Sequence, residues 1–314
     1  MEFNPNMKMS ALVDADYHLL PVLERLGLTE SFAEMTVSEM CDRNGLDTDT
    51  FVLLCSVYSS EEFKPTVAAL KKGHVTDVLR YLHQSHEHYS SDALVGLAGS
   101  IEELIAPCPL PQQKVIRGFF AEYKQELDRH FRFEEEMVIP YVQSLLVGKG
   151  RKAFSIDDFE KKHTNIEEKL SDLKNIVMKS LPPECDPSGR MALLHLIFEL
   201  QMDLSRHTRI ENSVLVPMVR LIENPRSVAP DYERRDTDSP TDETEELSAR
   251  EKEILVCVAK GMINKEIADR NGISVSTVIT HRKNITRKTG IRTVAGLTVY
   301  AILNGLIDIN AIEL

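Results

Sequence analysis

Hydrophobic and polar positions follow helical spacing along most of the chain. Runs in which apolar and polar residues alternate with period two, as strands require, are hard to find in the first 222 residues. Thr36 and Glu39 form a capping-box signature at the start of one helix, Asn44-Gly45 ends that helix, and Asp47 can cap the next one. We therefore expect an all-α protein.

The region after residue 246 has a helical pattern of its own. Ser248 can cap a first helix and Asn264 a short second helix, which ends in a tight turn at Asn271-Gly272. A longer third helix starts near Ser274. This order of helix, tight turn and helix predicts a helix-turn-helix unit.

The third of these helices has a polar and basic side. Its stripe residues are spaced i, i+4, i+7 and i+11, and no acidic residue occurs between Val275 and Thr289. Such a helix fits the DNA major groove, where Arg and Lys meet phosphates and guanine edges. A solvated basic face is the alternative for this helix taken alone. The residues predicted to contact DNA are Asn264, Lys265, Ser276, Thr277, Thr280, His281, Arg282, Lys283, Arg287 and Lys288.

Between the two helical regions lies a stretch of different composition. Residues 223–246 carry nine acids, three arginines, three prolines and only two aliphatic residues. Such a segment cannot bury enough apolar surface to become ordered, so we predict a flexible linker. We accordingly divide the chain into a small helical module (1–72), a four-helix bundle (73–222), this linker, and the helix-turn-helix domain (247–314).

The division at the linker changes the meaning of the net charge. The formal charge of the whole chain is -12, which by itself argues against a partner as acidic as DNA. Residues 247–314, however, contain ten Lys and Arg against six Asp and Glu, a charge of +4, which leaves -16 on residues 1–246. The C-terminal domain is therefore basic and compatible with DNA.

Length and cysteine usage exclude several classes of protein. The 314 residues, 42% of them hydrophobic, suffice for about two globular domains. The five cysteines are isolated and odd in number, so we expect neither a disulfide framework nor a thiolate metal site, and a reducing cytosol fits best. The first thirty residues lack the apolar core of a signal peptide, and no window of about 18 apolar residues occurs. We expect a soluble, cytoplasmic protein with no membrane partner.

The histidines follow an internal repeat. The segments HFRFEEEMVIPYV from His130 and HTRIENSVLVPMV from His207 both have Glu four residues on, Pro ten on and Val twelve on. The offset is 77 residues, and the same offset relates His86 to His163. This spacing indicates a duplicated helical hairpin. Pro140, like its repeat counterpart, is predicted to end or kink a helix.

The repeated positions are suited to bind metal. Residues four apart lie on one helix face, about 6 Å apart along the axis, so an imidazole and a carboxylate can share one centre. Two such hairpins form a four-helix bundle, and carboxylates on different helices suit a metal pair. We expect a di-iron centre, with manganese and zinc as alternatives; for either motif alone, an exposed intrahelical pair is the simpler interpretation. The predicted ligands are His86, His130, Glu134, His163, His207 and Glu211.

Neighbouring ionisable residues follow the repeat less well. Glu167, four residues after His163, is a candidate seventh ligand, but its counterpart 77 residues earlier is Ser90, so a solvated Glu167 is an equal alternative. Glu135 and Glu136 are expected to form a solvated face. His83 and His88 flank His86 and could substitute for it as a ligand, but only His86 obeys the repeat.

Residues 75–222 resemble a hemerythrin-like (HHE cation-binding) domain, especially that of the di-iron proteins that repair iron centres. The resemblance rests on the predicted ligands together with the V-I-P and V-P that follow them. It implies a di-iron centre that meets oxygen, nitric oxide or peroxide.

Residues 247–309 resemble a LuxR-type (GerE) helix-turn-helix domain. The matching stretches are LSAREKEIL, NKEIA, ISVSTV and THRKNI. The resemblance implies that residues 277–287 enter the groove of double-stranded DNA and that the last helix, TVAGLTVYAILNG, helps the chain form a homodimer.

Together these features predict a transcription regulator and not an enzyme. A hemerythrin-like di-iron bundle is expected to sense oxygen, nitric oxide, or redox or iron state and to modulate the helix-turn-helix domain. The rival is a di-iron oxidase or iron-centre repair protein with an accessory DNA-binding module. An acyl-homoserine lactone receptor is disfavoured because the N-terminal region is all-helical, and a phosphorylation-driven response regulator because no βα-repeat receiver is present.

Overall fold

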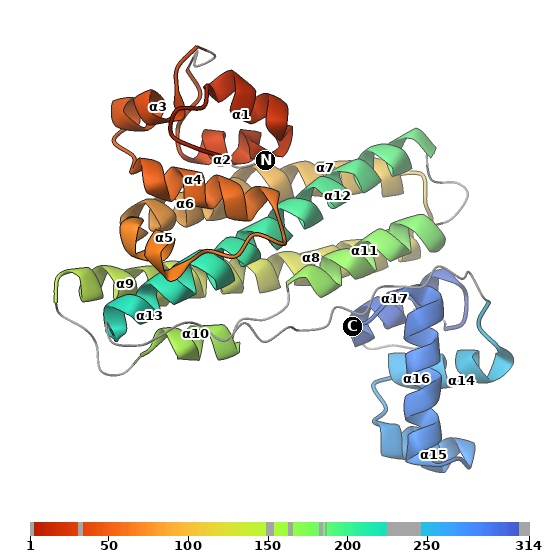
Figure 1. Ribbon diagram of the computed structural model, residues 1–314. Helices are drawn as coiled ribbons and strands as arrows, with labels where there is room; N and C mark the ends of the chain where they lie inside the picture. Colours follow the sequence, from red (N-terminus) through yellow and green to blue (C-terminus); the bar gives the residue numbers. More distant parts are fainter. Residues whose placement is uncertain are drawn as a thin grey trace. The chain divides into compact units, whose positions relative to one another are not determined.

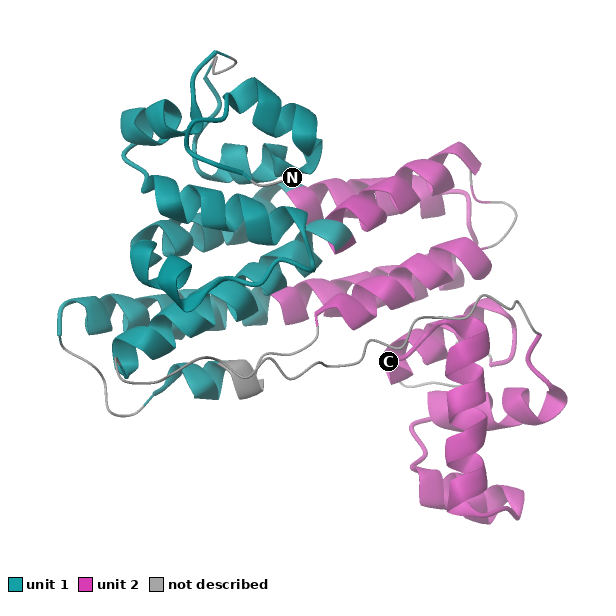
Figure 2. Ribbon diagram, viewed as in Figure 1, with its two compact units in different colours: residues 1–92, 128–164, 202–233 teal, residues 93–127, 165–201, 234–314 magenta. Residues whose placement is uncertain are grey.

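The computed structural model describes residues 3–30, 34–148, 154–162, 166–181, 185, 187–224 and 246–307. Regular secondary structure in these ranges is helical and includes no strand, which confirms the all-α prediction (Figure 1). The chain divides into two compact units (Figure 2). Unit 1 comprises residues 1–92, 128–164 and 202–233, and unit 2 comprises residues 93–127, 165–201 and 234–314.

Short helices form the first part of unit 1. The Thr36 hydroxyl accepts the Glu39 amide while the Glu39 carboxylate accepts the Thr36 amide, which confirms the predicted capping box. Gly45 ends this helix with a left-handed φ of 63°, and Asp47 caps the next helix. The short elements are α1 (Met9–Ala15), a 3-10 turn (Tyr17–Leu19), α2 (Leu20–Arg25), α3 (Val37–Asn44), α4 (Thr48–Ser59) and α5 (Val67–Lys72).

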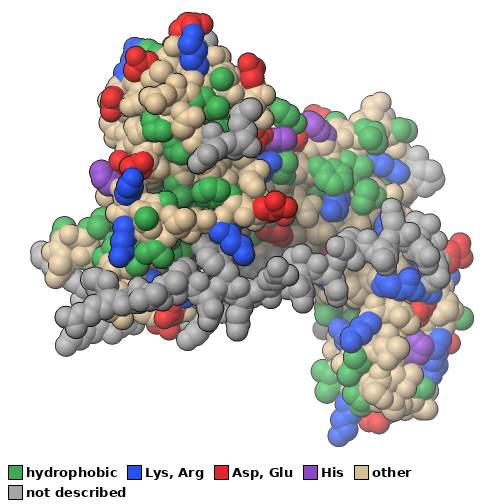
Figure 3. Space-filling view, viewed as in Figure 1, with side chains coloured by type: hydrophobic (Ala, Val, Ile, Leu, Met, Phe, Trp, Pro, Cys, Tyr) green, Lys and Arg blue, Asp and Glu red, His purple; other side chains and the backbone are tan. Residues whose placement is uncertain are grey.

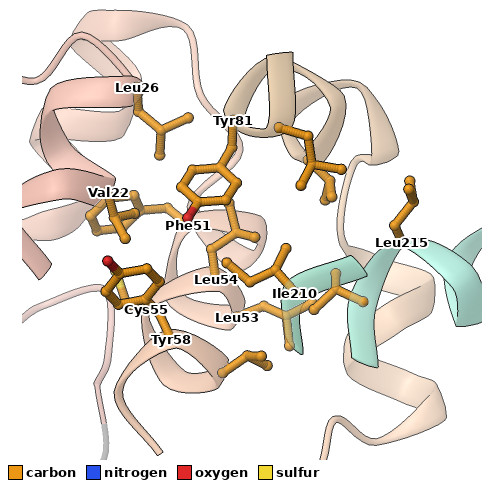
Figure 4. Packing of buried hydrophobic residues seen from close by; sticks show 14 of the residues in the cluster. Val22, Leu26, Phe51, Leu53, Leu54, Cys55, Tyr58, Tyr81, Ile210 and Leu215 are labelled. Carbon is orange, nitrogen blue, oxygen red and sulfur yellow. The ribbon is translucent and has the colours of Figure 1, made fainter. Parts of the chain in front are cut away.

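Longer helices share one hydrophobic core with these short ones. Figure 4 shows Phe51, Leu54 and Tyr58 of α4 gathered with Tyr81 of α6 and Ile210 of α12. The N-terminal helices are therefore packed into the same core as the helices that carry the predicted metal ligands. The remaining unit 1 helices are α6 (Val75–His88), the ends of α8 (Leu110–Phe133) and α12 (Pro187–Ile210), α9 (Ile139–Leu146), α10 (Ile156–Lys162) and α13 (Val216–Glu223).

Three π-helical turns among the described residues each connect two consecutive α-helices: α6 to α7 (Leu94–Ile105), α8 to α9, and α12 to α13. Two of these turns, Glu134–Val138 and Glu211–Leu215, begin at the repeated glutamates, and the third spans Tyr89–Ala93. Pro140 and Pro217 are the second residues of α9 and α13, so the chain stays helical through both prolines. The missing proline N–H is compatible with the altered hydrogen bonding of the preceding π turn, and such turns are frequent at functional sites.

Unit 2 contains α7 (Leu94–Ile105), the first part of α8, α11 (Glu167–Lys179) and the first part of α12. Ion pairs join neighbouring helices: Arg117 of α8 pairs with Glu102 of α7 at 2.7 Å, and Lys169 of α11 pairs with Glu126 of α8 at 2.7 Å. These four helical segments belong to the region predicted to be a bundle.

Cys108 and Cys185 of unit 2 form a disulfide. Their Cα atoms lie 6.1 Å apart, and 77 residues separate them along the chain, the offset of the histidine repeat. The expectation of no disulfide was therefore wrong, because it rested on local cysteine spacing while the fold brings distant cysteines together. Cys41, Cys55 and Cys257 are free and buried.

Unit 2 also contains the four C-terminal helices. The predicted capping box of Ser248 and Glu251 is confirmed. Ile263, not Asn264, occupies the cap position of the second helix, so Asn264 is its first helical residue. Gly272 closes this helix with a φ of 63°. The helices are α14 (Ala249–Ala259), α15 (Asn264–Asn271), α16 (Val275–Thr289) and α17 (Val294–Leu303).

The predicted domain boundaries stay predictions. The first of them falls directly after α5, at Gly73, and the linker predicted over residues 223–246 lies almost entirely outside the described residues. Among the described helices, none combines the length and the apolar character that crossing a membrane requires.

Candidate metal centre and DNA-binding helices

Four predicted ligands converge in unit 1. His86 of α6, Glu134, His207 of α12 and Glu211 each offer a ligand atom, and these atoms all lie within 4.8 Å of one another. His86 Nε2 is 2.9 Å from Glu134 Oε2 and 3.3 Å from His207 Nε2. The four side chains are at most 5% exposed. The sequence repeat thus becomes a compact, buried cluster of nitrogen and oxygen donors.

The two repeated motifs fold alike. His130 Nε2 lies 3.1 Å from Glu134 Oε1, and His207 Nε2 lies 3.2 Å from Glu211 Oε1. Both pairs are i,i+4 pairs that end at the first residue of a π turn. His130 therefore adjoins the four-residue cluster through Glu134.

Besides His130, which only adjoins this cluster, two predicted ligands are not part of it. His163 lies outside the described residues. Glu167 is the first residue of α11 and belongs to unit 2. Both remain predictions for the metal site.

Glu135 contacts the cluster, although we expected a solvated side chain. Its Oε1 lies 2.6 Å from His86 Nδ1, and its Oε2 lies 2.9 Å from His83 Nδ1. The expectation assumed ordinary α-helical spacing, but a π turn starts at Glu134 and changes which neighbours face the site. A carboxylate on the second ring nitrogen of a ligating histidine fixes the tautomer and the ring orientation. His83 in turn helps to position Glu135.

The two central histidines differ in their electrostatics. Burial opposes a proton on His86, but its hydrogen bonds to Glu134 and Glu135 raise the pKa of His86 to about 9. Burial, and to a smaller extent the neighbouring His86, lower the pKa of His207 below its ordinary value, although Glu211 and Glu134 oppose this shift. His86 is thus flanked by carboxylates on both ring nitrogens.

This donor set fits a transition metal. Two imidazoles and two carboxylates suit iron, manganese or zinc, and a nearly dry surrounding strengthens the attraction between carboxylates and a cation. The His207 Nδ1 atom and the Tyr89 hydroxyl are buried without a hydrogen-bond partner among the described residues. A buried polar atom of this kind needs an explanation, and beside a cluster of donors a metal site supplies one.

The N-terminal helices contribute a buried ion pair one helical turn from His207. Arg25 of α2 donates to both carboxylate oxygens of Asp203 on α12, with Nη1 at 2.9 Å from Oδ1. The Tyr58 hydroxyl donates to the same Oδ1 at 2.7 Å, and the Arg25 guanidinium lies 4.9 Å from the centre of the Tyr89 ring. Residues 1–72, which had no predicted role, therefore support the helix that carries a metal ligand.

The predicted DNA-contacting stripe on α16 is exposed, while Val278 and Ile285 are buried as expected. Lys265 is exposed on α15. Figure 3 shows Lys and Arg side chains on the surface of the C-terminal helices. The exposed stripe residues are Ser276, Thr280, Lys283 and Arg287.

Other predicted DNA-contacting residues also have contacts inside the domain. Arg282 Nη1 donates to Asn264 Oδ1 at 2.9 Å and so ties α16 to α15. Lys288 Nζ lies 2.9 Å from Glu251 Oε2, with the two side chains 12% and 5% exposed. The Thr277 hydroxyl lies 2.8 Å from that of Ser274, and His281 is half-buried. The most accessible basic side chains for phosphate contact are thus those of the exposed stripe and Lys265.

One face of α11 holds the start of α17. Asp172 is completely buried and accepts the backbone amides of Arg292 and Thr293 at 2.8 and 2.9 Å and the Thr293 hydroxyl at 2.5 Å. Burial raises the pKa of Asp172 although these hydrogen bonds oppose the shift. A Cβ atom at Gly296 would lie only 2.6 Å from Asp172 Oδ2, so glycine permits this close approach.

The same face of α11 also holds the end of α16. Asn175 Nδ2 donates to the Gly290 carbonyl at 2.8 Å, and Lys179 Nζ donates to the Thr289 carbonyl at 3.2 Å. An acidic group at a helix start and a basic group at a helix end both complement helix dipoles. Long-range contacts of this kind leave no spacing signal, so the sequence did not predict them. We call Asp172, Asn175 and Lys179 the α11 docking face.

Fold and site together define an all-α chain that joins a buried His/Glu metal-type cluster to a helix-turn-helix. Residues 74–219 match the hemerythrin HHE cation binding domain, and residues 245–301 match the bacterial regulatory proteins of the luxR family. The chain therefore carries both of the domains that the sequence resembled, in one polypeptide.

Curated relatives match part of the chain. The "Transcriptional regulatory protein MctR" of Rhizobium johnstonii is 47% identical over 62 residues, 20% of this chain and 29% of that protein. The "Oxygen regulatory protein NreC" of Staphylococcus aureus is 42% identical over 74 residues, 24% of this chain and 34% of that protein. The chain thus spans about a third of the length of these relatives. No solved structure matches it significantly.

Proposed function

We propose that the chain is a DNA-binding transcription regulator whose metal-binding bundle controls its helix-turn-helix domain. The observation that carries the proposal is the buried cluster of His86, Glu134, His207 and Glu211 in the same polypeptide as a LuxR-type domain. Regulators with similar segments, one of them named for oxygen regulation, support the class of function. The double-stranded DNA is contacted by the exposed stripe of α16.

The proposed cofactor is a di-iron centre held by the predicted ligands. Iron bound there would supply a group whose state depends on oxygen, nitric oxide or redox conditions. The protein residues have distinct roles: Glu135 fixes the His86 ring through Nδ1, and the dry surroundings exclude competing water. Arg25 and Asp203 keep α12 in position one turn away.

A continuous path of residues can transmit a change at the centre to the DNA-binding helices. The helix α12 carries both His207 and Gln201, and Gln201 accepts a hydrogen bond from Lys174 of α11 at 3.1 Å. The docking face lies on that same α11. A change in metal ligation that shifts α12 would therefore also shift α11. The contacts of α11 with residues 289–293 would then weaken or strengthen, which changes the equilibrium between C-terminal helices docked on α11 and C-terminal helices released from it.

Release of the docked helices fits dimeric DNA binding. The last helix is the dimerising element that the LuxR-type resemblance implies, and Asp172 holds Arg292 and Thr293, directly before this helix, in the docked state. We propose that the DNA-binding form is a homodimer in which α17 has left the docking face. A single basic module binds modestly, and two linked modules gain by effective concentration.

Metal analysis of the purified full chain tests this proposal, combined with absorption spectra taken with and without air. We expect two irons per chain and a spectrum that changes with oxygen. Absence of bound metal after reconstitution would contradict the proposal. Sustained oxidase turnover, with DNA affinity unaffected by metal, would instead favour the rival enzyme.

A further inference from the structure

The two cysteines of the disulfide occupy equivalent places in the duplicated hairpins. Cys108 lies in the connection between α7 and α8, and Cys185 lies between α11 and α12. Their 77-residue separation equals the offset between the repeated His-Glu motifs. The disulfide therefore joins one hairpin covalently to the other.

The surroundings favour a defined pair. The Cα separation of 6.1 Å falls within the range that a disulfide spans without backbone movement. The Gln113 side chain donates to the carbonyls of Cys108 and Ala106 at 2.7 and 3.1 Å and so fixes the first connection. Cys108 and Cys185 are 4% and 1% exposed. The pair is thus positioned by the fold and shielded from unselective oxidation.

The remaining cysteines differ from this pair in that none of them forms a disulfide. Burial raises the pKa of Cys41 to about 12, and full burial raises the pKa of the Cys55 thiol well above its ordinary value. A thiol with a raised pKa contains little of the reactive thiolate. Cys257 is also buried and free. These three cysteines serve as internal controls for any reaction of the pair.

We propose that Cys108 and Cys185 form a reversible thiol–disulfide site, a second input to the regulator that does not involve the metal cluster. The reaction partner is a small-molecule disulfide of the glutathione type. A thiolate of the pair attacks it, releases one small thiol and forms a mixed disulfide; the second cysteine then displaces the other small thiol. One disulfide is consumed, one is formed and two small thiols are released, so electrons balance. Reduction follows the same steps in reverse.

The site has a structural route to the DNA-binding helices. The helix α11 ends at Lys179, shortly before Cys185, and carries the docking face. The disulfide ties Cys185 to the connection between α7 and α8, which we expect to favour the docked state, and reduction removes this tie. This readout rests on the proposed function. We expect the reduced protein to bind DNA about tenfold more tightly than the oxidised protein, within the usual range of coupling between two sites.

Thiol counting on the full-length protein tests the site itself. The native chain is equilibrated with mixtures of reduced and oxidised glutathione, alkylated and analysed by peptide mass spectrometry. We expect thiols at positions 108 and 185 to appear and disappear reversibly, and the free thiols at the other three positions to stay unchanged. A pair that stays reduced in every mixture, or stays oxidised in excess reduced glutathione, would overturn the proposal.

DNA binding tests the readout separately. Cys108→Ser and Cys185→Ser should each bind DNA like the reduced protein under oxidising conditions, whereas Cys257→Ser should behave like the wild type. The DNA affinities of oxidised and reduced wild-type protein are also compared directly, so the test does not depend on the folding of any variant. Equal DNA affinity of the two states, with the thiol exchange intact, would overturn the coupling. The metal dependence of DNA binding tests the proposed function independently.

Discussion

Both units bury carboxylates, but the partners of these carboxylates differ. In unit 1, Glu134 and Glu211 face imidazole nitrogens at 2.9 to 3.2 Å. In unit 2, Asp172 accepts three hydrogen bonds from Arg292 and Thr293, directly before α17. Two backbone amides and one hydroxyl therefore satisfy the Asp172 carboxylate. The glutamates lie among groups that themselves are metal donors.

The difference shows how a buried carboxylate can serve either to hold two helices together or to bind a metal ion. A carboxylate among amide donors fixes one helix against another, because moving apart leaves the buried charge unsatisfied. A carboxylate among imidazole nitrogens instead has neighbours that can bind the same metal ion as the carboxylate does. We therefore interpret the unit 1 cluster as a metal site and the α11 docking face as a mechanical contact.

The largest effect is expected from removing a ligand. His207→Ala and Glu211→Ala should each lose most of the bound metal, because each removes a donor from a closed, buried set. Metal content per chain measures this. His88→Ala on α6 is the matched control, since His88 is part-exposed and pairs only loosely with Asp92 at 3.6 Å. Full metal content in both ligand variants would refute the assignment.

Arg25→Ala should destabilise the protein strongly. The substitution leaves Asp203 buried without its guanidinium partner, which typically costs about 3 kcal/mol or more in the free energy of unfolding. Arg43→Ala removes an exposed pair with Glu30 and should cost at most about 1 kcal/mol. Chemical denaturation of both variants measures the difference. Equal losses would mean that the buried pair is not a support of the metal-bearing helix.

Glu135→Gln should weaken metal binding without abolishing it. The amide cannot supply the charge that orients His86 through Nδ1, and loss of such a partner usually lowers metal affinity about 10- to 100-fold. Competition with a chelator of known affinity measures the change. Glu136→Gln next to it is the control, because Glu136 is exposed. An unchanged affinity for Glu135→Gln would show that Glu135 has no part in the site.

Gly296→Ala should free the DNA-binding helices. Alanine suits an α-helix better than glycine by about 0.5 to 1 kcal/mol, although its Cβ would lie 2.7 Å from Ile291 Cγ2, so the Ile291 side chain must shift to admit it. The same Cβ would lie 2.6 Å from Asp172 Oδ2 in the docked state. DNA affinity of the variant should rise and lose its dependence on metal, as measured by fluorescence anisotropy. If the DNA affinity of Gly296→Ala depended on metal as that of the wild type does, docking on α11 would not be the means of regulation.

The smallest effect is expected in the loss of stability at low pH that Asp203 causes. Burial opposes ionisation of Asp203, but Arg25 and Tyr58 lower its pKa below the ordinary 3.8. The folded pKa lies below the unfolded one, so this stabilisation is present above about pH 4 and is lost as pH falls through the folded pKa. Unfolding midpoints measured from pH 6 downward should fall more steeply for wild type than for Asp203→Asn. Parallel curves would contradict this contribution.

The sequence predicted the elements that depend on local signals. Capping residues marked the helices at Thr36 and Ser248, and the repeat located both His-Glu motifs. It missed Glu135, because a π turn changes the helical spacing there. It missed the disulfide although Cys108 and Cys185 obey the 77-residue repeat, since that offset was applied only to histidines and glutamates.

Contacts between distant segments could not be predicted in this way. The pairing of Arg25 with Asp203 and that of Asp172 with the start of α17 join residues more than a hundred positions apart. No periodicity relates such residues, and each would be unremarkable on a helical wheel. The repeat succeeded only because duplication copied the same chemistry at a constant distance along the chain.

The central claim is that metal at the His/Glu cluster controls the DNA-binding helices. The most direct test is the dissociation constant of the full-length protein for a duplex selected from a random-sequence pool, measured at one salt concentration with iron bound and after chelation. The account predicts that the two constants differ at least about fivefold, the low end of coupling between distinct sites. Equal constants for the iron-bound and metal-free protein would contradict it.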